Sequence, residues 1–167
     1  MTPPIVCFVG RSNSGKTTLI ERLILELTGE GYRVATIKHA GHGFDLDTEG
    51  KDSWRHKRAG ASQVVILSKG SLAMFTDVAE ELPVEEIRAR FINRDIDLII
   101  AEGWKSQGFP KIVVVREELQ EVEVSLEGLI AVASIKPIKV DVPWFDRDDA
   151  HGLAQLLITR FPLQVDT

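Results

Sequence analysis

The amino-acid sequence predicts an α/β fold of three layers, in which helices pack against a mostly parallel sheet. Two observations carry this prediction. Apolar runs typical of buried strands alternate with amphipathic segments along the 167 residues, which is the pattern of α/β domains. In addition, residues 5–37 read as strand, helix and strand, and such a unit predicts a right-handed parallel crossover.

The amino-terminal unit has clear local signals. Residues 5–9 form a near-continuous apolar run, as expected of a central parallel strand buried on both faces. Glycines at positions 29 and 31 are expected to end the helix that follows, and residues 34–37 form the second strand. Between strand and glycines, apolar residues recur at helical spacing, namely Leu19, Ile20, Leu23, Ile24 and Leu27.

The middle of the chain predicts a short helix and a hairpin. Residues 54–59 are expected to form the helix, and the apolar runs 63–68 and 71–76 are joined through Lys69-Gly70. That spacing is typical of a β-hairpin. We therefore expect part of the sheet to be antiparallel.

The remaining elements continue the alternation. Pro83 is expected to begin a helix, and residues 97–103 form an apolar strand that ends in a carboxylate. Further strands are expected at 111–115 and 129–133, and a last helix capped by Asp148 or Asp149. Its core face is expected to be Leu153, Leu156, Leu157 and Phe161. No linker divides the chain, so we expect a single domain over 1–167.

Composition narrows the classes of function. The formal net charge is −5, with 20 Lys and Arg against 25 Asp and Glu, which argues against non-specific binding of nucleic acid. No apolar run approaches the roughly 18 residues of a membrane span, and the first residues lack the pattern of a signal peptide. The single cysteine, Cys7, is expected to be a small buried hydrophobic residue. We expect a cytoplasmic protein without membrane contact.

The most informative stretch is the glycine-bracketed turn after the first strand. It has the pattern G-x-x-x-x-G-K-[ST] between a strand and a helix, which predicts a P-loop NTPase fold. Gly10 and Gly15 allow the backbone amides to form an anion nest, and the helix adds its amino-terminal dipole. Lys16 is expected to reach the β- and γ-phosphates, and Thr17 to bind Mg²⁺. The predicted phosphate-binding residues are Gly10, Arg11, Ser12, Asn13, Ser14, Gly15, Lys16, Thr17 and Thr18.

A carboxylate follows another buried strand, at the edge where ligands of parallel sheets collect. Glu102 is expected to hold Mg²⁺ directly or through water, or to polarise an attacking water. With Lys16 it is a candidate catalytic residue. Asp45 and Asp47, in the long polar stretch 38–53, are alternative sources of a second metal ligand, because Mg²⁺ prefers oxygen donors. Trp104, Lys105 and Lys111 are expected to line the path of an anionic ligand.

The base specificity stays open at this point. Many GTPases carry Asn-Lys-x-Asp after a late strand. The corresponding segment here, residues 133–137, reads Ala-Ser-Ile-Lys-Pro and lacks the carboxylate that would accept from the N1 and N2 donors of guanine. The residues alone therefore do not decide between guanine and adenine.

Four segments follow one another in a specific order. They are residues 10–17, residues 38–47 with Phe44-Asp45-Leu46-Asp47, Gly50-Lys51-Asp52-Ser53 with Ala59-Gly60-Ala61, and residues 97–105 with Pro110-Lys111. Together they resemble the MobB family of molybdopterin-guanine dinucleotide biosynthesis proteins, over about two thirds of the chain.

The resemblance implies a GTP-binding protein with weak GTPase activity, usually a homodimer. It would act as an adaptor beside the MobA-type guanylyltransferase that joins GMP to molybdopterin. By the same resemblance residues 10–18 would bind phosphates, and Asp45 or Asp47 with Glu102 would serve Mg²⁺. The implied ligands are GTP, Mg²⁺ and molybdopterin. Two alternatives remain open from the residues: a small-molecule kinase on the same fold, and a pterin-binding module with a vestigial nucleotide site.

Overall fold

A computed structural model describes residues 2–41, 43–44, 47–104, 108–116, 127–161 and 163. The chain divides into two compact units, Met1–His39 with Ile92–Thr167, and Ala40–Phe91. Each is described by itself, and the expectation of one domain over 1–167 stays a prediction. Among the described residues, no helix has the length and apolar character that crossing a membrane requires.

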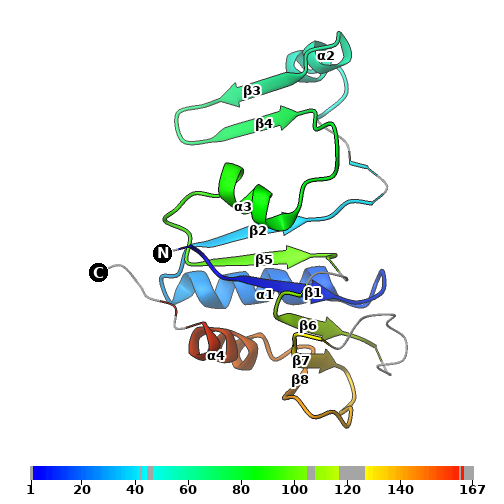
Figure 1. Ribbon diagram of the computed structural model, residues 1–167, viewed down its shortest axis with the longest axis vertical. Helices are drawn as coiled ribbons and strands as arrows, with labels where there is room; N and C mark the ends of the chain where they lie inside the picture. The colour runs from blue at the N-terminus through cyan, green and yellow to red at the C-terminus, as the bar shows by residue number, and fades with distance from the viewer. Residues whose placement is uncertain are drawn as a thin grey trace. The chain divides into compact units, whose positions relative to one another are not determined.

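The larger unit contains one parallel sheet of six strands (Figure 1) in the order β2-β5-β1-β6-β7-β8. The strands are β1 (Ile5–Val9), β2 (Val34–Lys38), β5 (Leu98–Glu102), β6 (Lys111–Val114), β7 (Leu129–Ser134) and β8 (Trp144–Asp146). The three-residue strand β8 was not predicted. Among the described residues of this unit, the helices are α1 (Lys16–Gly29) and α4 (Ala150–Arg160).

One hydrophobic cluster joins the sheet to α1 and α4. It includes alternate residues of the central strands, such as Phe8 of β1 and Ile100 of β5, together with Leu23 of α1 and Leu157 of α4. The strand residues that lie between them in sequence, such as Cys7, are buried too, as the apolar runs predicted. Asp149 caps α4, because its side chain accepts a hydrogen bond from the Gly152 amide at 2.8 Å.

A polar ladder lines α1 and α4. Arg22 and Glu26 of α1 and Glu30, which caps it, are spaced four residues apart and bond to the chain around α4, because residues at this spacing share one face of a helix. The pairs are Arg22 with Asp148, Glu26 with His151 at 2.9 Å, and Glu30 with Gln155 at 2.8 Å. The Glu26 carboxylate accepts a hydrogen bond from His151 Nδ1 and thereby raises the pKa of His151 above its ordinary value of 6.5. The ladder lies on the face of α1 that is turned toward the start of α4.

The smaller unit holds α2 (Asp52–Arg58), β3 (Gln63–Leu67), β4 (Leu72–Thr76) and α3 (Val84–Phe91). The hairpin was predicted, but its place was wrong: β3 and β4 pair antiparallel in a sheet of their own, and the six-stranded sheet is parallel throughout. The spacing of a hairpin reports local pairing only, so it could not show which sheet the strands join. Lys57 fastens α2 to the hairpin through the Ala61 carbonyl at 2.8 Å and Asp77 at 2.6 Å.

Two leucines of α1 give a matched test of this packing. Leu23 is fully buried in the cluster, whereas Leu25 is 71% exposed on the same helix. We expect Leu23→Ala to lower the free energy of unfolding by about 2–5 kcal/mol, because it leaves a cavity. Leu25→Ala should change it by less than about 0.5 kcal/mol. Urea unfolding followed by circular dichroism measures both, and equal losses would contradict the arrangement of α1.

Candidate functional site

The loop between β1 and α1 has the backbone conformation of an anion nest. Gly15 has φ +95° and Asn13 has φ +61°, so the chain curls tightly before α1 begins at Lys16. A Cβ atom on Gly10 would lie 2.2 Å from the Val114 carbonyl oxygen. Only glycine therefore allows this close approach of the loop to β6.

Cationic side chains hold the carbonyl groups of the loop. The Lys16 ammonium donates to the carbonyls of Gly10 at 3.0 Å and Arg11 at 2.6 Å. Two arginines from distant parts of the chain bind further carbonyl groups of the loop. Arg116 Nε donates to the Asn13 carbonyl at 3.0 Å, and Arg147 Nη1 donates to the Ser14 carbonyl at 3.4 Å.

The sheet order brings Glu102 to the same edge as the loop. Strand β5 lies between β1 and β2, and in the register Glu102 is level with Phe8 on one side and Lys38 on the other. Lys38 Nζ is 3.9 Å from Glu102 Oε2. This ion pair is weak, because most of the Lys38 side chain is exposed to solvent.

Gly103 follows Glu102 and has φ +107°, a conformation that favours glycine. A Cβ atom added to Gly103 would lie 3.2 Å from the His39 Cβ, so the two residues are closely packed.

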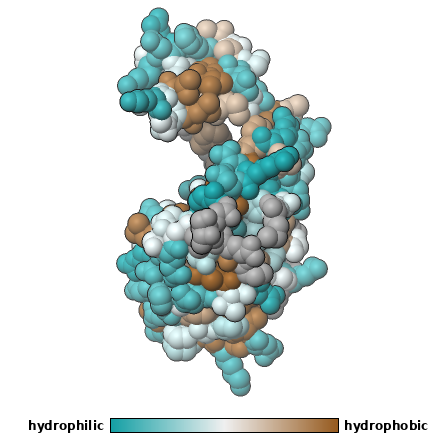
Figure 2. Space-filling model, turned by 90° about the vertical axis from the view of Figure 1, so that its left-hand side faces the viewer, coloured by the Kyte–Doolittle hydropathy of each residue, from teal (hydrophilic) through white to brown (hydrophobic). Residues whose placement is uncertain are grey.

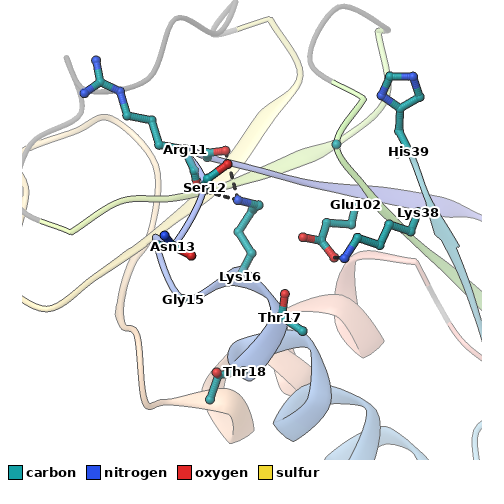
Figure 3. A pocket seen from close by; sticks show the side chains of 12 residues that line it. Arg11, Ser12, Asn13, Gly15, Lys16, Thr17, Thr18, Lys38, His39 and Glu102 are labelled. Atoms are coloured by element: carbon teal, nitrogen blue, oxygen red, sulfur yellow. Dashed lines mark hydrogen bonds and ion pairs between the residues drawn. The ribbon is translucent and has the colours of Figure 1, made fainter. Parts of the chain in front are cut away.

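These residues surround one cavity of about 740 Å³. Figure 3 shows Lys16 between the loop and Glu102, with the Thr17 hydroxyl turned toward the Glu102 side and Thr18 on the opposite side. The cavity is lined by Gly10, Arg11, Ser12, Asn13, Gly15, Lys16, Thr17, Thr18, Lys38, His39, Glu102 and Gly103. Of the predicted phosphate-binding residues, only Ser14 is not at its surface; the Ser14 side chain is buried beneath the loop.

The oxygen donors at the cavity suit Mg²⁺. The Thr17 hydroxyl and the Glu102 carboxylate are hard ligands of the kind that Mg²⁺ prefers, and this ion usually takes only one or two protein ligands beside phosphate and water. Among the described residues, no group of three His, Cys, Asp or Glu side chains could hold a metal ion. The site therefore fits a metal whose shell is completed by a polyphosphate.

The other two candidate carboxylates have different outcomes. Asp45 lies outside the described residues. Asp47 belongs to the smaller unit, where it accepts hydrogen bonds from the Ser53 hydroxyl and from the Thr48 amide at 2.6 Å. The Ser53 bond, followed by the Thr48 bond, lowers the pKa of Asp47. Asp47 thus supports the start of α2, and its role as a metal ligand stays a prediction.

Two residues expected beside the ligand path lie elsewhere. Lys111 is the first residue of β6 and is buried, level with Cys7 in the middle of β1. Lys111 is thus one residue deeper in the sheet than Glu102, which is level with Phe8, and it does not line the cavity. Trp104 is buried with its ring 5.4 Å from that of His39, and it does not line the cavity. Lys105 lies outside the described residues.

The sequence reasoning missed Arg116 and Arg147. Arg147 follows β8, a strand too short to be recognised from its apolar pattern. A signal was present in the run Asp146-Arg147-Asp148-Asp149, which places an arginine among acidic residues just before a helix.

Comparison with known proteins identifies the family. A family model described as molybdopterin guanine dinucleotide synthesis protein B matches residues 5–135. The chain belongs to the MobB family. It is 38% identical over 158 residues to the molybdopterin-guanine dinucleotide biosynthesis adapter protein of Haemophilus influenzae, covering 92% of this chain and 87% of that protein. The adapter protein of Escherichia coli K12 is 37% identical over 160 residues, covering 93% and 91%.

Solved MobB structures share the fold. A crystal structure of molybdopterin-guanine biosynthesis protein B superposes with a TM-score of 0.79 at 35% identity, covering 95% of this chain and 99% of that chain. The crystal structure of Bacillus subtilis MobB gives 0.78 at 30% identity, covering 98% and 99%. The α/β class, the mostly parallel sheet and the family resemblance are therefore confirmed.

The close approach at Gly10 gives a test of the loop. We expect Gly10→Ala to cost about 1–3 kcal/mol of stability, because its methyl group would overlap the Val114 carbonyl, and to weaken nucleotide binding as the loop shifts. Gly29→Ala is the matched control, since no atom lies within 4 Å of the added methyl group. Thermal unfolding and titration with labelled nucleotide measure both effects. Equal behaviour of the two variants would contradict the loop geometry.

Proposed function

We propose that this MobB protein is a magnesium-dependent GTP-binding adaptor with weak GTPase activity in the biosynthesis of molybdopterin guanine dinucleotide. One observation carries the proposal: a single cavity combines the nest after β1 with Lys16, Thr17 and Glu102. The guanine preference and the partnership with a MobA-type guanylyltransferase rest on the family and on the names of the relatives. We place this role in the cytoplasm.

The proposed binding mode assigns each group a task. The inward amides of the loop and the dipole of α1 bind the phosphates, and the Lys16 ammonium neutralises the terminal ones. Thr17 and Glu102 hold Mg²⁺, which would bridge the β- and γ-phosphates and offset their charge. In this proposal the cavity binds the nucleotide. Molybdopterin is the substrate of the pathway in which the chain acts as an adaptor, and we assign no part of this cavity to it.

Slow turnover follows from the residues at the cavity. GTPases that hydrolyse quickly use an arginine finger and a glutamine that orients the attacking water. Among the described residues that line this cavity there is no glutamine, and the single arginine, Arg11, is exposed. We therefore expect a turnover number for GTP well below roughly 1 s⁻¹, the lower end of the typical range for kinases. Phosphoryl transfer to a metabolite at or above that rate would favour the alternative of a small-molecule kinase.

Nucleotide titration with a matched pair of lysine variants tests this proposal. We expect the protein to bind labelled GTP more tightly than ATP in the presence of Mg²⁺, and to lose that affinity when Mg²⁺ is chelated. Lys16→Ala should abolish tight binding, whereas Lys139→Ala, an exposed lysine outside the cavity, should leave it unchanged. Tighter binding of ATP, or an unchanged affinity of Lys16→Ala, would overturn the proposal.

The hairpin of the smaller unit supports the homodimer in this proposal. Both of its strands are sheet edges with unpaired main-chain groups, and a hairpin alone is only marginally stable in water. Figure 2 shows apolar surface on the unit that contains it. The exposed apolar residues of β3 and β4 are Val65, Ile66, Leu67, Leu72 and Met74. A second copy of the chain, adding its own hairpin, would cover them.

Charged substitutions at the hairpin test the dimer. Leu67 and Leu72 are opposite each other in the register and exposed, so Leu67→Glu with Leu72→Glu should fold normally. We expect this double variant to run at half the mass of the parent chain in light scattering. Leu25→Glu, equally exposed on α1, should remain dimeric. A monomeric parent chain, or a dimeric double variant, would contradict the proposal.

A further inference from the structure

The cavity has two distinguishable ends. The Thr17 hydroxyl and Glu102 mark one end, where Mg²⁺ and the terminal phosphates belong in the proposed function (Figure 3). Thr18 lies about 100° further around α1 and faces the other way. A nucleoside triphosphate bound in this direction extends from Glu102 toward Thr18, so its nucleoside lies beyond Thr18.

The polar ladder shows what lies beyond Thr18. Thr18 and Arg22 are four residues apart and share one face of α1. Arg22 bonds to Asp148, in the turn between β8 and α4. That turn, residues 146–149, therefore stands beside the nucleoside end of the cavity.

Arg147 of this turn lies directly on the loop. Its Cδ, Nε and Nη1 atoms are 2.9–3.1 Å from where a Cβ of Gly15 would be, and its amide donates to the Ser134 carbonyl at 3.0 Å. The guanidinium is a planar cation that stacks well on rings. It is half-buried next to the amino-terminal end of α1, at the point where a nucleotide changes from phosphate to nucleoside.

The ends of β7 and β8 are fixed to each other. The Ser134 hydroxyl accepts from Trp144 Nε1 at 2.7 Å and donates to the Lys136 carbonyl at 2.6 Å. Ser134 is also level with Asp146 in the register. This arrangement places a carboxylate beside the segment 134–137, which the sequence had shown to lack one.

Of the three aspartates in the turn, Asp146 is the one suited to bind a ligand. Asp148 is paired with Arg22, and Asp149 caps α4. Asp146 is exposed, and its Oδ1 accepts from the Asp148 amide at 2.8 Å. That bond orients the carboxylate and leaves Oδ2, and the second lone pair of Oδ1, to accept from a ligand.

We propose that the turn at residues 146–147 is the nucleoside-binding and base-selecting element of this chain. The Arg147 guanidinium lies against the plane of the purine, and the Asp146 carboxylate accepts hydrogen bonds from the N1 and N2 donors of guanine. Adenine presents an acceptor at N1 and would leave the carboxylate unmatched. This inference rests on the proposed GTP-binding function. It assigns the specificity for guanine to two residues directly before the predicted cap of the last helix.

An exchange of base specificity tests Asp146. An asparagine at this position can donate to the C2 carbonyl of xanthine, which replaces the amino group of guanine. We expect Asp146→Asn to bind Mg²⁺-GTP about 10- to 100-fold more weakly, the effect of losing charge-assisted hydrogen bonds, and to gain affinity for xanthosine triphosphate. Asp141→Asn, an exposed aspartate ahead of β8, should keep the specificity of the parent chain.

Competition with inorganic tripolyphosphate tests Arg147. If Arg147 contacts the nucleoside, Arg147→Ala should weaken GTP and GDP by the same factor, about 10-fold, and weaken tripolyphosphate by a clearly smaller factor, which reports the lost support of the Ser14 carbonyl alone. Arg160→Ala, at the exposed end of α4, is the matched control. A loss of tripolyphosphate affinity equal to that for GTP would show that Arg147 only supports the loop.

The outcomes separate the two proposals. A parent chain that binds no Mg²⁺-GTP overturns the proposed function, and this inference falls with it. A parent chain that binds GTP through Lys16, combined with an Asp146→Asn variant that keeps its preference for GTP over xanthosine triphosphate, overturns this inference alone. Thermal unfolding of every variant shows that a change in affinity is not a loss of fold.

Discussion

The orientation of the main chain between Gly10 and Lys16 is the constraint on which the rest of the site depends. Amides can point into a nest only if the carbonyls of the same peptides point outward and find donors there. Arg116 and Arg147 are such donors, for the carbonyls of residues 13 and 14, whereas Lys16, which lines the cavity, donates to the carbonyls of residues 10 and 11. Three cationic side chains thus hold the loop, and one of them, Lys16, lies where a polyphosphate would bind.

The site also requires that residues far apart in the sequence lie at the same edge of the sheet, and the parallel sheet brings them there. Glu102 lies beside the loop because β5 is inserted between β1 and β2, although it follows β2 by some sixty residues in sequence. All strands of this sheet run the same way, so each strand end adds its side chains to one surface. Lys38 arrives from β2, Glu102 from β5, and the turn with Arg147 from β8.

Much of this arrangement could be predicted from the sequence, because its signals are local. The strand, loop and α1 were recognisable from an apolar run, two glycines and helical spacing, and Glu102 from its place after a buried strand. The parts that could not be predicted depend on long-range contacts. Arg116 and Arg147 meet the loop across 103 and 133 residues, and no local pattern reports that. The burial of Lys111 is of the same kind, since a strand pattern does not show which neighbouring strands cover its first residue.

Separation along the chain also explains why residues 133–137 carry a lysine without the carboxylate of a base-reading motif. A compact motif places the lysine and the carboxylate on a single strand end, where sequence spacing reveals them. In this chain Lys136 follows β7 by two residues, Asp146 ends β8, and the Ser134 hydroxyl connects the two strands. In the proposed site, the placement of the base-binding residues after β8 links base recognition to phosphate binding. In that site Arg147 contacts both the phosphate loop and the purine. Displacement of the base would therefore also disturb the hydrogen bond to the Ser14 carbonyl. Recognition of the base and binding of the phosphates are thus coupled through one side chain.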